Sequence, residues 1–314
     1  MKKIIFLIVF LAAFTIYGLR QRSVEPGPLT EVRHAVIPKG SSSAQAASIL
    51  AENGVISSPW LFRLAAKWQK LDKVLKAGEY QFMPRQSMQE VLEKIASGEV
   101  FFRRITLAEG LTSGQMLYQI ASAPDLSGEI SIEVKEGELL PETYSYELRA
   151  SRDSVVIQAR QAMNKAIADV WAQRGENLPI KTPEQMLILA SIIEKETAVD
   201  GERPLVASVF VNRLRKGMRL QTDPTVIYAL TEGLFELGRS LKKADLKIDS
   251  PYNTYKYYGL PPGPICNPGR AALNAAVNPA ETGFLYFVAD GKGGHNFAAS
   301  LNEHNRNIRS WLKR

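Results

Sequence analysis

The amino-acid sequence predicts an α+β protein in three parts: an N-terminal transmembrane helix over residues 1–22, a small module over residues 31–99 and a larger α+β domain over residues 100–314. Three observations carry this prediction. An apolar run opens the chain, a short stretch rich in Pro and Gly follows it, and the remainder combines short strand-like runs with longer segments of helical periodicity. At 314 residues, the chain is long enough for about two domains of ordinary size.

The N-terminal segment has the charge pattern of a signal anchor. Lys2 and Lys3 precede an apolar run over residues 4–19, which is short for a membrane-spanning helix and long for the core of a signal peptide. No convincing cleavage site follows, so we expect an uncleaved, single-pass anchor in the inner (cytoplasmic) membrane, with the rest of the chain on the periplasmic side. A cleaved signal peptide is the alternative. Arg20 and Arg22 oppose this orientation, because such residues favour the cytoplasmic side.

The module over residues 31–99 is expected to combine two strands with helices. Gly54 is placed to end one helix, and Ser58 with Pro59 to begin the next. The expected elements are strands at residues 32–37 and 79–82 and helices at residues 43–53, 58–70 and 87–97. Strand, two helices and strand is the order that resembles a LysM-like carbohydrate-binding module, whereas the pattern by itself indicates a small α+β unit.

Beyond residue 100 the sequence predicts a mixed domain. Thr182 and Pro183 are typical of a helix start, and the Gly-rich turn at residues 291–294 predicts a hairpin. The expected elements are strands at residues 101–107, 284–289 and 295–297 and helices at residues 112–121, 154–173, 182–197, 203–216 and 300–313.

Composition and charge exclude several classes of protein. The net charge of +7 favours an anionic partner without selecting one, and the absence of a helix-turn-helix or zinc-finger pattern argues against nucleic acid. The single cysteine, Cys266, cannot form an intrachain disulfide. His34, His295 and His304 share no metal-ligand spacing, so neither a metal nor another cofactor is expected.

The helix over residues 182–197 carries the acids that best fit catalysis. Glu194 and Glu196 emerge among apolar side chains on opposite flanks of this helix. Loss of solvation raises the pKa of such a carboxyl group, as a general acid near neutral pH requires. Periodicity does not choose between the two glutamates, and both could instead be structural partners of Arg or Lys. Ser191, three residues before Glu194, is expected either to hold substrate or Glu194, or to bond back to its own helix.

A first polar segment downstream is a candidate for one wall of a substrate groove. Gln221, Thr222 and Asp223 precede Pro224 and predict a turn. Asp223 could cap the helix that follows, so capping and a role in the groove are both open.

A second polar segment is a candidate for the same groove. Tyr252, Asn253, Thr254 and Tyr255 belong to a Tyr-rich loop, and aromatic faces suit the C–H faces of sugars. The alternative is a loop packed by its own rings. The segment at residues 259–269 contains several prolines and is expected to be a stiff groove wall.

Several long motifs occur in one order along nearly the whole chain, and SIIEKET at residues 191–197 is the central one. The others are TLAEGLT at residues 106–112, LLPETY at 139–144, LQTDPTV at 220–226, SPYNTY at 250–255 and GLPPGPICNPG at 259–269. In this combination the sequence resembles the MltG (YceG-like) family of endolytic murein transglycosylases, which cut the glycan strands of peptidoglycan.

The resemblance implies roles for these residues. The first glutamate of the central motif corresponds to the family's catalytic residue, so Glu194 is expected to serve as both acid and base. The resemblance implies cleavage of the MurNAc–GlcNAc bond of nascent strands with formation of a 1,6-anhydro end, which ends strand elongation. Ser191, Glu196 and the two polar segments are expected to bind substrate.

The resemblance also implies partners: peptidoglycan glycan strands and peptidoglycan synthases (penicillin-binding proteins), but no nucleic acid. The competing hypothesis from a different class is a non-catalytic, membrane-anchored scaffold that binds peptidoglycan and tethers those synthases. A desolvated acid at Glu194 is the feature that would separate the two, because a scaffold has no use for one.

Overall fold

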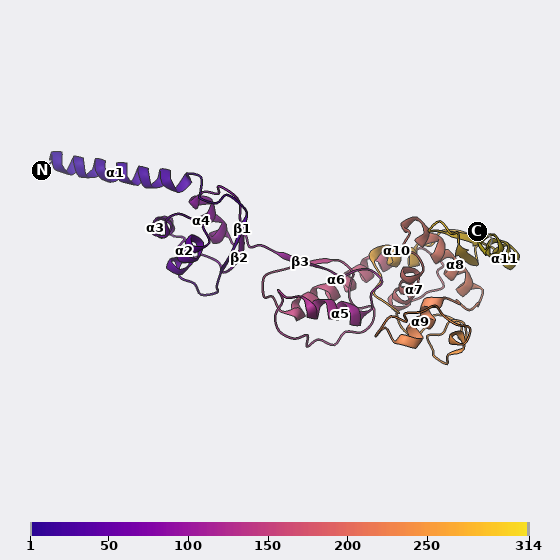
Figure 1. The fold of residues 1–314 in the computed structure, drawn as a ribbon. Helices are drawn as coiled ribbons and strands as arrows, with labels where there is room; N and C mark the ends of the chain where they lie inside the picture. Colours follow the sequence, from indigo (N-terminus) through magenta and orange to yellow (C-terminus); the bar gives the residue numbers. More distant parts are fainter. Residues whose placement is uncertain (1, 313–314) are drawn as a thin grey trace. The chain divides into compact units, whose positions relative to one another are not determined.

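The structure is a computed structural model, and it describes residues 2–312 (Figure 1). The α+β prediction is confirmed: two-stranded sheets accompany a larger set of helices within that range. The contacts divide the chain into two compact units, Met1–Arg103 with Ser145–Arg149 and Arg104–Tyr144 with Ala150–Arg314. Residues 1, 313 and 314, which belong to the expected first and last parts, lie outside the described residues.

The predicted transmembrane helix over residues 1–22 is wrong. Among residues 2–312, no helix combines the length and the apolar character that crossing a membrane requires. Helix α1 (Lys2–Val24) includes Lys3 near its start and Arg20 and Arg22 near its end. The apolar run between these charges has 16 residues and rises about 24 Å at 1.5 Å per residue, less than the roughly 30 Å of a bilayer core. The same finding overturns the predicted single-pass inner-membrane location.

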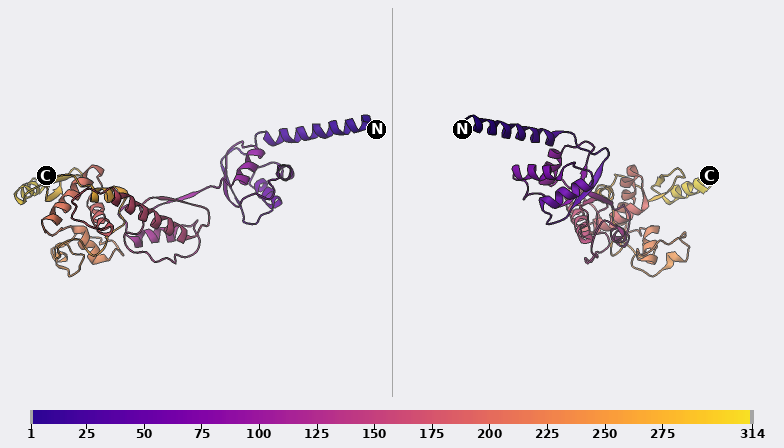
Figure 2. Two further views of the ribbon diagram at one scale, coloured as in Figure 1. Left: turned by 180° about the vertical axis from the view of Figure 1, so that it is seen from behind. Right: turned by 60° about the vertical axis from the view of Figure 1, so that its left-hand side comes forward.

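The first unit has the strands and helices expected of a small α+β module, and its LysM-like character stays a prediction. Strands β1 and β2 pair antiparallel, with Arg33 opposite Phe82 and Ile37 opposite Gly78. The core beneath them includes the fully buried rings of Phe62, Tyr80 and Phe82. Both figures show α1 extending beyond the module as a single rod (Figures 1 and 2). The elements are β1 (Arg33–Ile37), α2 (Ser43–Glu52), α3 (Pro59–Trp68), β2 (Gly78–Phe82) and α4 (Met88–Ser97).

The second unit is organised around α7 (Pro183–Glu196), which packs against α6, α8, α9 and α10 (Figure 1). Half of α7 is buried, and its Met186, Leu189 and Ile193 belong to the main core. The remaining elements along the chain are β3 (Arg103–Thr106), α5 (Ser113–Ser122), β4 (Thr143–Tyr146), α6 (Arg152–Ala172), η1 (Asp200–Glu202), α8 (Arg203–Arg215), α9 (Asp223–Thr231), η2 (Asp245–Lys247), α10 (Arg270–Val277), β5 (Tyr286–Ala289), β6 (His295–Ala298) and α11 (Leu301–Leu312).

Candidate active site

Helix α7 begins where its sequence predicts and presents both glutamates at its C-terminal end. The Thr182 hydroxyl accepts a hydrogen bond from the Gln185 N–H, and Pro183 occupies the first turn. The Gln185 side chain accepts from the Lys181 N–H at 2.6 Å, one residue before the cap. Glu196 is the last residue of the helix, and both glutamates are half-buried.

Glu194 is held in a network of charged and backbone groups. Its side chain is only 5% exposed, its Oε2 accepts the Gly269 N–H at 2.8 Å and its Oε1 lies 3.5 Å from the Arg203 guanidinium. Arg203 is itself buried and also lies 3.6 Å from Glu109. Burial raises the pKa of Glu194, although the Gly269 N–H acts against that rise. The arrangement ties α7 to the start of α8 and to the N-terminus of α10.

The polypeptide next to Gly269 is fixed by a fully buried amide. Asn267 donates from its side chain to the Leu111 carbonyl at 3.1 Å and accepts the Leu139 N–H at 2.9 Å. Glu136 accepts the Ser113 N–H at 2.8 Å in the same cluster, and burial raises the pKa of that carboxyl. Buried polar contacts therefore hold the segment at residues 259–269, which was expected to form a groove wall. The hydrogen bond from the Gly269 N–H to Glu194 is one of these contacts.

Glu196 has a different environment, at the side of a cavity of 420 Å³. The Thr222 hydroxyl donates a hydrogen bond to Glu196, which is half-buried like Glu194. Burial raises the pKa of Glu196 to about 7, and the nearby Asp223 adds to that rise. A carboxyl group with this pKa carries a proton for about half of the time at neutral pH, and the cavity gives a ligand access to it.

The cavity is built from segments that are far apart in the sequence. Its residues come from α7, α8, the 220–223 segment, the 250–258 loop, β5 and α11. They are Glu196, Phe210, Arg213, Leu220, Gln221, Asp223, Tyr255, Tyr286, Phe287, Leu301 and His304. Glu194 is not among them, so the two glutamates of one motif occupy separate surroundings.

The two predicted polar segments meet beside this cavity. The Gln221 N–H donates to the Thr254 carbonyl at 3.2 Å, and the Thr222 N–H donates to the Thr254 hydroxyl at 3.1 Å. Gln221 adopts a φ of +53°, a left-handed conformation that is unfavourable for residues other than glycine. Tyr255 donates from its hydroxyl to the Asp223 carboxylate at 2.6 Å. These contacts bring Gln221, Asp223 and Tyr255 to the same cavity wall.

Other predicted site residues have structural environments instead. Tyr252 packs against the ring of Tyr228 with centroids 4.8 Å apart. Asn253 is fully buried and donates to the Leu246 and Ile248 carbonyls. Ser191 is also fully buried; its hydroxyl donates to the Ile188 carbonyl at 2.8 Å and accepts the Ile265 N–H at 3.0 Å.

Arg213, Tyr286 and His304 also line the cavity, and the sequence did not predict them. The Arg213 guanidinium lies over the Tyr286 ring, 5.1 Å from its centroid, and the His304 ring stacks on Tyr286 at 5.1 Å. Arg213 donates to the Leu220 carbonyl at 2.7 Å, so it also holds the polar segment in place. Burial lowers the pKa of His304, and the Arg213 charge lowers it further. No short spacing links these three residues, so no local signal marked them.

Comparisons with known proteins agree with this architecture. The YceG-like family matches residues 35–310. An endolytic murein transglycosylase of Bacillus subtilis (strain 168) is 33% identical over 86% of this chain and 82% of its own length. An endolytic murein transglycosylase of Streptococcus pneumoniae (strain D39) is 29% identical over 87% of this chain, which spans 57% of that relative.

A solved structure gives the same result at the level of the fold. The 2.6 Å crystal structure of a putative YceG-like protein from Listeria monocytogenes superimposes with a TM-score of 0.55 at 31% identity. The match covers 88% of this chain and 98% of the listerial one. The family resemblance predicted from the motifs is thereby confirmed, and the chain belongs to the YceG-like family.

Proposed function

We propose that this chain is an endolytic murein transglycosylase, a lyase that cleaves the glycan strands of peptidoglycan without water. The names of its relatives in Bacillus and Streptococcus support the reaction class. The observation that carries the proposal in this chain is Glu196, a carboxyl group with a pKa of about 7 at the wall of a 420 Å³ cavity.

The proposed reaction needs one acid that acts twice. Protonated Glu196 donates its proton to the glycosidic oxygen that joins MurNAc C1 to the next GlcNAc, and the C1–oxygen bond breaks. The C6 hydroxyl of the same MurNAc then forms a bond to C1 and loses its proton to the Glu196 carboxylate. The products are a 1,6-anhydro end and a free GlcNAc hydroxyl, and Glu196 is protonated again. Because the nucleophile belongs to the substrate, its effective concentration is high.

The geometry favours Glu196 over Glu194 as this acid. The family resemblance assigns the role to Glu194, whose pKa is also raised. However, the two Glu194 oxygens already face the Gly269 N–H and Arg203, and the side chain is 5% exposed. Glu196 lines the cavity, and the hydrogen bond that it receives comes from the Thr222 hydroxyl. We therefore propose Glu196 as the catalytic acid and Glu194 as the residue that fixes α7 against the 265–269 wall.

Three neighbours of Glu196 complete the proposed site. Asp223 raises the pKa of Glu196 and places negative charge where a positively charged sugar ring develops in the transition state. Tyr255 orients Asp223 through its hydroxyl. Gln221, whose unusual backbone brings it to the same wall, offers an amide for the N-acetyl or hydroxyl groups of the sugar.

The wider role follows from the same resemblance. Cleavage within nascent strands would limit their length, so the enzyme is proposed to act as a terminase of elongation beside peptidoglycan synthases (penicillin-binding proteins). The rival hypothesis of a non-catalytic scaffold predicts that no bond is cut, so a product assay separates the two.

The test is digestion of purified sacculi by the full chain, with mass spectrometry of the released muropeptides. Wild-type protein is expected to produce 1,6-anhydro ends. Glu196→Gln keeps the size of the side chain but cannot donate a proton at neutral pH, so activity should fall by at least about 10²- to 10⁴-fold. Glu194→Gln is the matched control, the same change two residues away, and is expected to keep most of the activity.

Each alternative outcome has a clear meaning. Loss of activity in Glu194→Gln with a retained rate in Glu196→Gln would return the catalytic role to Glu194. Absence of anhydro ends from wild-type digests would contradict the proposed reaction. Circular dichroism of both variants excludes misfolding as the cause of any loss.

A further inference from the structure

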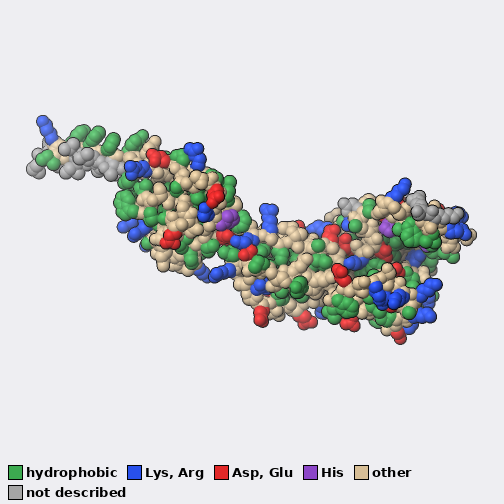
Figure 3. All heavy atoms as spheres, in the orientation of Figure 1, with side chains coloured by type: hydrophobic (Ala, Val, Ile, Leu, Met, Phe, Trp, Pro, Cys, Tyr) green, Lys and Arg blue, Asp and Glu red, His purple; other side chains and the backbone are tan. Residues whose placement is uncertain are grey.

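Arg213 of α8 is a buried cation without a carboxylate partner. Figure 3 shows Lys and Arg side chains spread over the surface, where water solvates their charges. Among residues 2–312 two arginines are buried, Arg203 at 5% and Arg213 at 8% exposed. Arg203 lies 3.5 Å from Glu194 and 3.6 Å from Glu109, whereas Arg213 has no carboxylate that close in the described chain. Because a charge removed from water without a counterion is costly, this arrangement favours an anionic ligand.

The hydrogen bonds of Arg213 orient its guanidinium and leave one nitrogen without a partner. Nε donates to the Leu285 carbonyl at 2.7 Å, and Nη1 donates to the Leu220 carbonyl at 2.7 Å. Nη2 donates to no residue between 2 and 312. Burial lowers the pKa of Arg213, and the nearby Glu196 opposes that change only in part. The guanidinium is therefore fixed in place before any ligand binds, with one donor left over.

A second unpartnered group lines the same cavity. His304 stacks on the Tyr286 ring, and its Nδ1 is buried without a hydrogen-bond partner in the part of the chain that the structure describes. The cavity of 420 Å³ also contains Arg213 and the proposed acid Glu196 among its walls. A neutral imidazole has one donor and one acceptor nitrogen, so His304 offers a further hydrogen bond beside the Arg213 charge. Two polar groups of one cavity therefore lack partners within the chain.

From these observations we propose that Arg213 selects glycan strands through a carboxylate that the bound muramyl sugar carries. The inference rests on the proposed function, which brings such a sugar to Glu196. A carboxylate accepts a charge-assisted hydrogen bond from Nη2 and supplies the counterion that Arg213 lacks. The group has two possible sources: the lactyl carboxylate of a MurNAc without a stem peptide, or a carboxylate of an attached stem peptide. Both sources present the same chemistry to the guanidinium.

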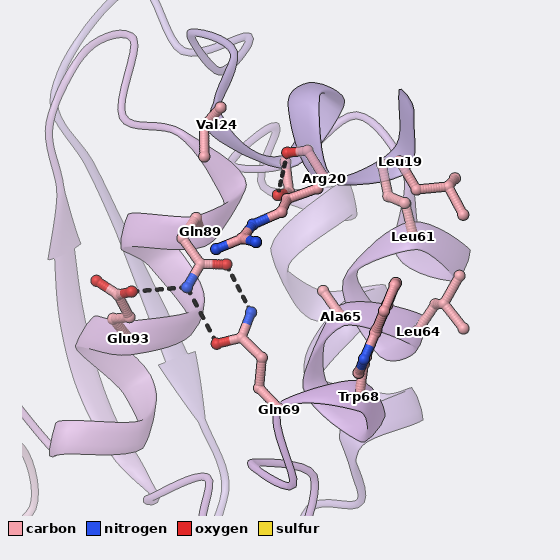
Figure 4. A pocket seen from close by; sticks show the side chains of 11 residues that line it. Leu19, Arg20, Val24, Leu61, Leu64, Ala65, Trp68, Gln69, Gln89 and Glu93 are labelled. Atoms are coloured by element: carbon pink, nitrogen blue, oxygen red, sulfur yellow. Dashed lines mark hydrogen bonds between the residues drawn. The ribbon is translucent and has the colours of Figure 1, made fainter. Parts of the chain in front are cut away.

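A hollow of 520 Å³ between α1, α3 and α4 in the first unit is a weaker candidate (Figure 4). Its polar groups satisfy one another, because Gln69 and Gln89 exchange hydrogen bonds at 2.7 and 3.0 Å and Gln89 donates to Glu93 at 2.6 Å. Its cation, Arg20, is exposed, so water already solvates that charge. Among residues 2–312, no buried side-chain nitrogen or oxygen of this hollow lacks a partner.

The test measures binding of the disaccharide GlcNAc–MurNAc to the full chain. This probe contains no MurNAc–GlcNAc bond, so the proposed reaction cannot consume it. It is used in two pairs: with a free lactyl carboxylate and as the lactyl methylamide, and with a stem peptide and with that peptide's carboxylates methylamidated. Ligand-observed NMR gives the Kd of each form. In at least one pair the neutral form should bind at least about tenfold more weakly than the acid, and that pair identifies the source of the carboxylate.

Variants assign this preference to one side chain. Arg213→Gln removes the charge and should bring the Kd values of acid and amide together. Arg213→Lys keeps the charge but not the planar fork, so it should bind the acid more weakly than wild type and leave the amide unchanged. This second variant decides the test if Arg213→Gln does not fold. Arg215→Gln is the matched control, the same change at an exposed position of the same helix, and should bind like wild type.

Three results would overturn the inference. The first is equal binding of acid and amide by wild type in both pairs, which needs no variant. The second is an unchanged preference in Arg213→Gln or, where that variant does not fold, in Arg213→Lys. The third is loss of the preference in Arg215→Gln. Failure of the proposed function shows elsewhere, as the absence of anhydro ends from digested sacculi, because the disaccharides report binding alone.

Discussion

Glu194 and Glu196 belong to the same seven-residue motif but have different surroundings in the fold, because different neighbours contact them. Glu194 meets the Gly269 N–H and Arg203, whereas Glu196 meets the Thr222 hydroxyl and lies near Asp223. Burial raises the pKa of both carboxyl groups, but of the two only Glu196 lines the cavity. A general acid requires both a raised pKa and access to its substrate.

The first residue-scale prediction concerns the pH dependence of cleavage. Glu196 must be protonated to act as the acid, and its pKa is raised to about 7, so kcat/KM should decline as pH rises through about 7. Because Asp223 raises the pKa of Glu196, Asp223→Asn should move this decline to lower pH. Tyr255→Phe removes only the hydrogen bond to Asp223 and serves as the control. An identical alkaline limb in wild type and Asp223→Asn would contradict the coupling.

The second residue-scale prediction concerns stability. The folded-state pKa of Glu196 lies above its unfolded value, so folding loses free energy as pH rises from the unfolded pKa toward about 7. Glu196→Gln removes the ionisation, and its free energy of unfolding should exceed that of wild type by at most about 3 kcal/mol at pH 8. At pH 4 the two proteins should be equal. Urea unfolding at both pH values measures the difference, and a variant less stable at pH 8 would contradict it.

At this scale the sequence predicted the kind of residue but not the choice between two. Helical periodicity placed both glutamates among apolar neighbours and could not rank them. The deciding partners, Thr222 and Arg203, come from other elements, and Arg203 heads the next helix. Their positions depend on how α7, α8 and α9 pack. The periodicity of a short segment contains no information about hydrogen bonds to residues that are distant in the sequence.

At the scale of elements, local signals placed the helices well. Ser42, Ser87 and Thr112 each accept the N–H three residues later, and each forms a capping box with the Gln or Glu found there. Gly98 ends α4 in the left-handed conformation at φ +77°. These contacts form within one turn of chain, so the sequence contains them in full.

The walls of the cavity were the part that local signals could not supply. Gln221 and Asp223 were predicted from their own turn, but Arg213, Tyr286 and His304 were not. The latter three come from α8, β5 and α11, and they meet because the β5–β6 hairpin and α11 return to pack near α8. A contact of this kind depends on tertiary packing rather than on propensity.

The element-scale prediction concerns the link between α7 and α8. Arg203 lies 3.5 Å from Glu194 and 3.6 Å from Glu109, so Arg203→Gln leaves two carboxylates facing each other, one of them buried. The free energy of unfolding should fall by about 3 kcal/mol. Adding Glu194→Gln to Arg203→Gln should recover part of that loss, because the buried charge is removed as well. Four proteins in a double-mutant cycle measure the coupling, and purely additive effects would rule out a direct interaction.

At the scale of the whole molecule, the sequence predicted the α+β class and misjudged the N-terminus. The charge flanks and the apolar run of the first residues were typical of an anchor, but helix α1 fails the criterion of length and apolarity together. A run of 16 residues that is apolar except at Thr15 and Gly18 has a length at which membrane spans and shorter hydrophobic segments overlap. At this length, the sequence pattern does not distinguish a membrane-spanning helix from a shorter hydrophobic segment.

The last prediction follows from the two hydrophobic cores. One core contains Leu92 and belongs to the first unit, whereas the other contains Leu189 of α7 and belongs to the second. Each unit buries its own apolar side chains, so each should unfold as its own cooperative step rather than in one two-state transition. Differential scanning calorimetry of the full chain should therefore resolve two transitions.

Matched variants identify the two transitions. Leu92→Ala and Leu189→Ala delete the same atoms at fully buried positions, and each should cost about 2–5 kcal/mol in its own unit. Leu92→Ala should lower the midpoint of one transition and leave the other unchanged, and Leu189→Ala should do the reverse. A single transition that both variants lower equally would mean that the two cores melt together. Glu196→Gln provides the internal check, because its stabilisation at pH 8 should raise only the transition that Leu189→Ala lowers.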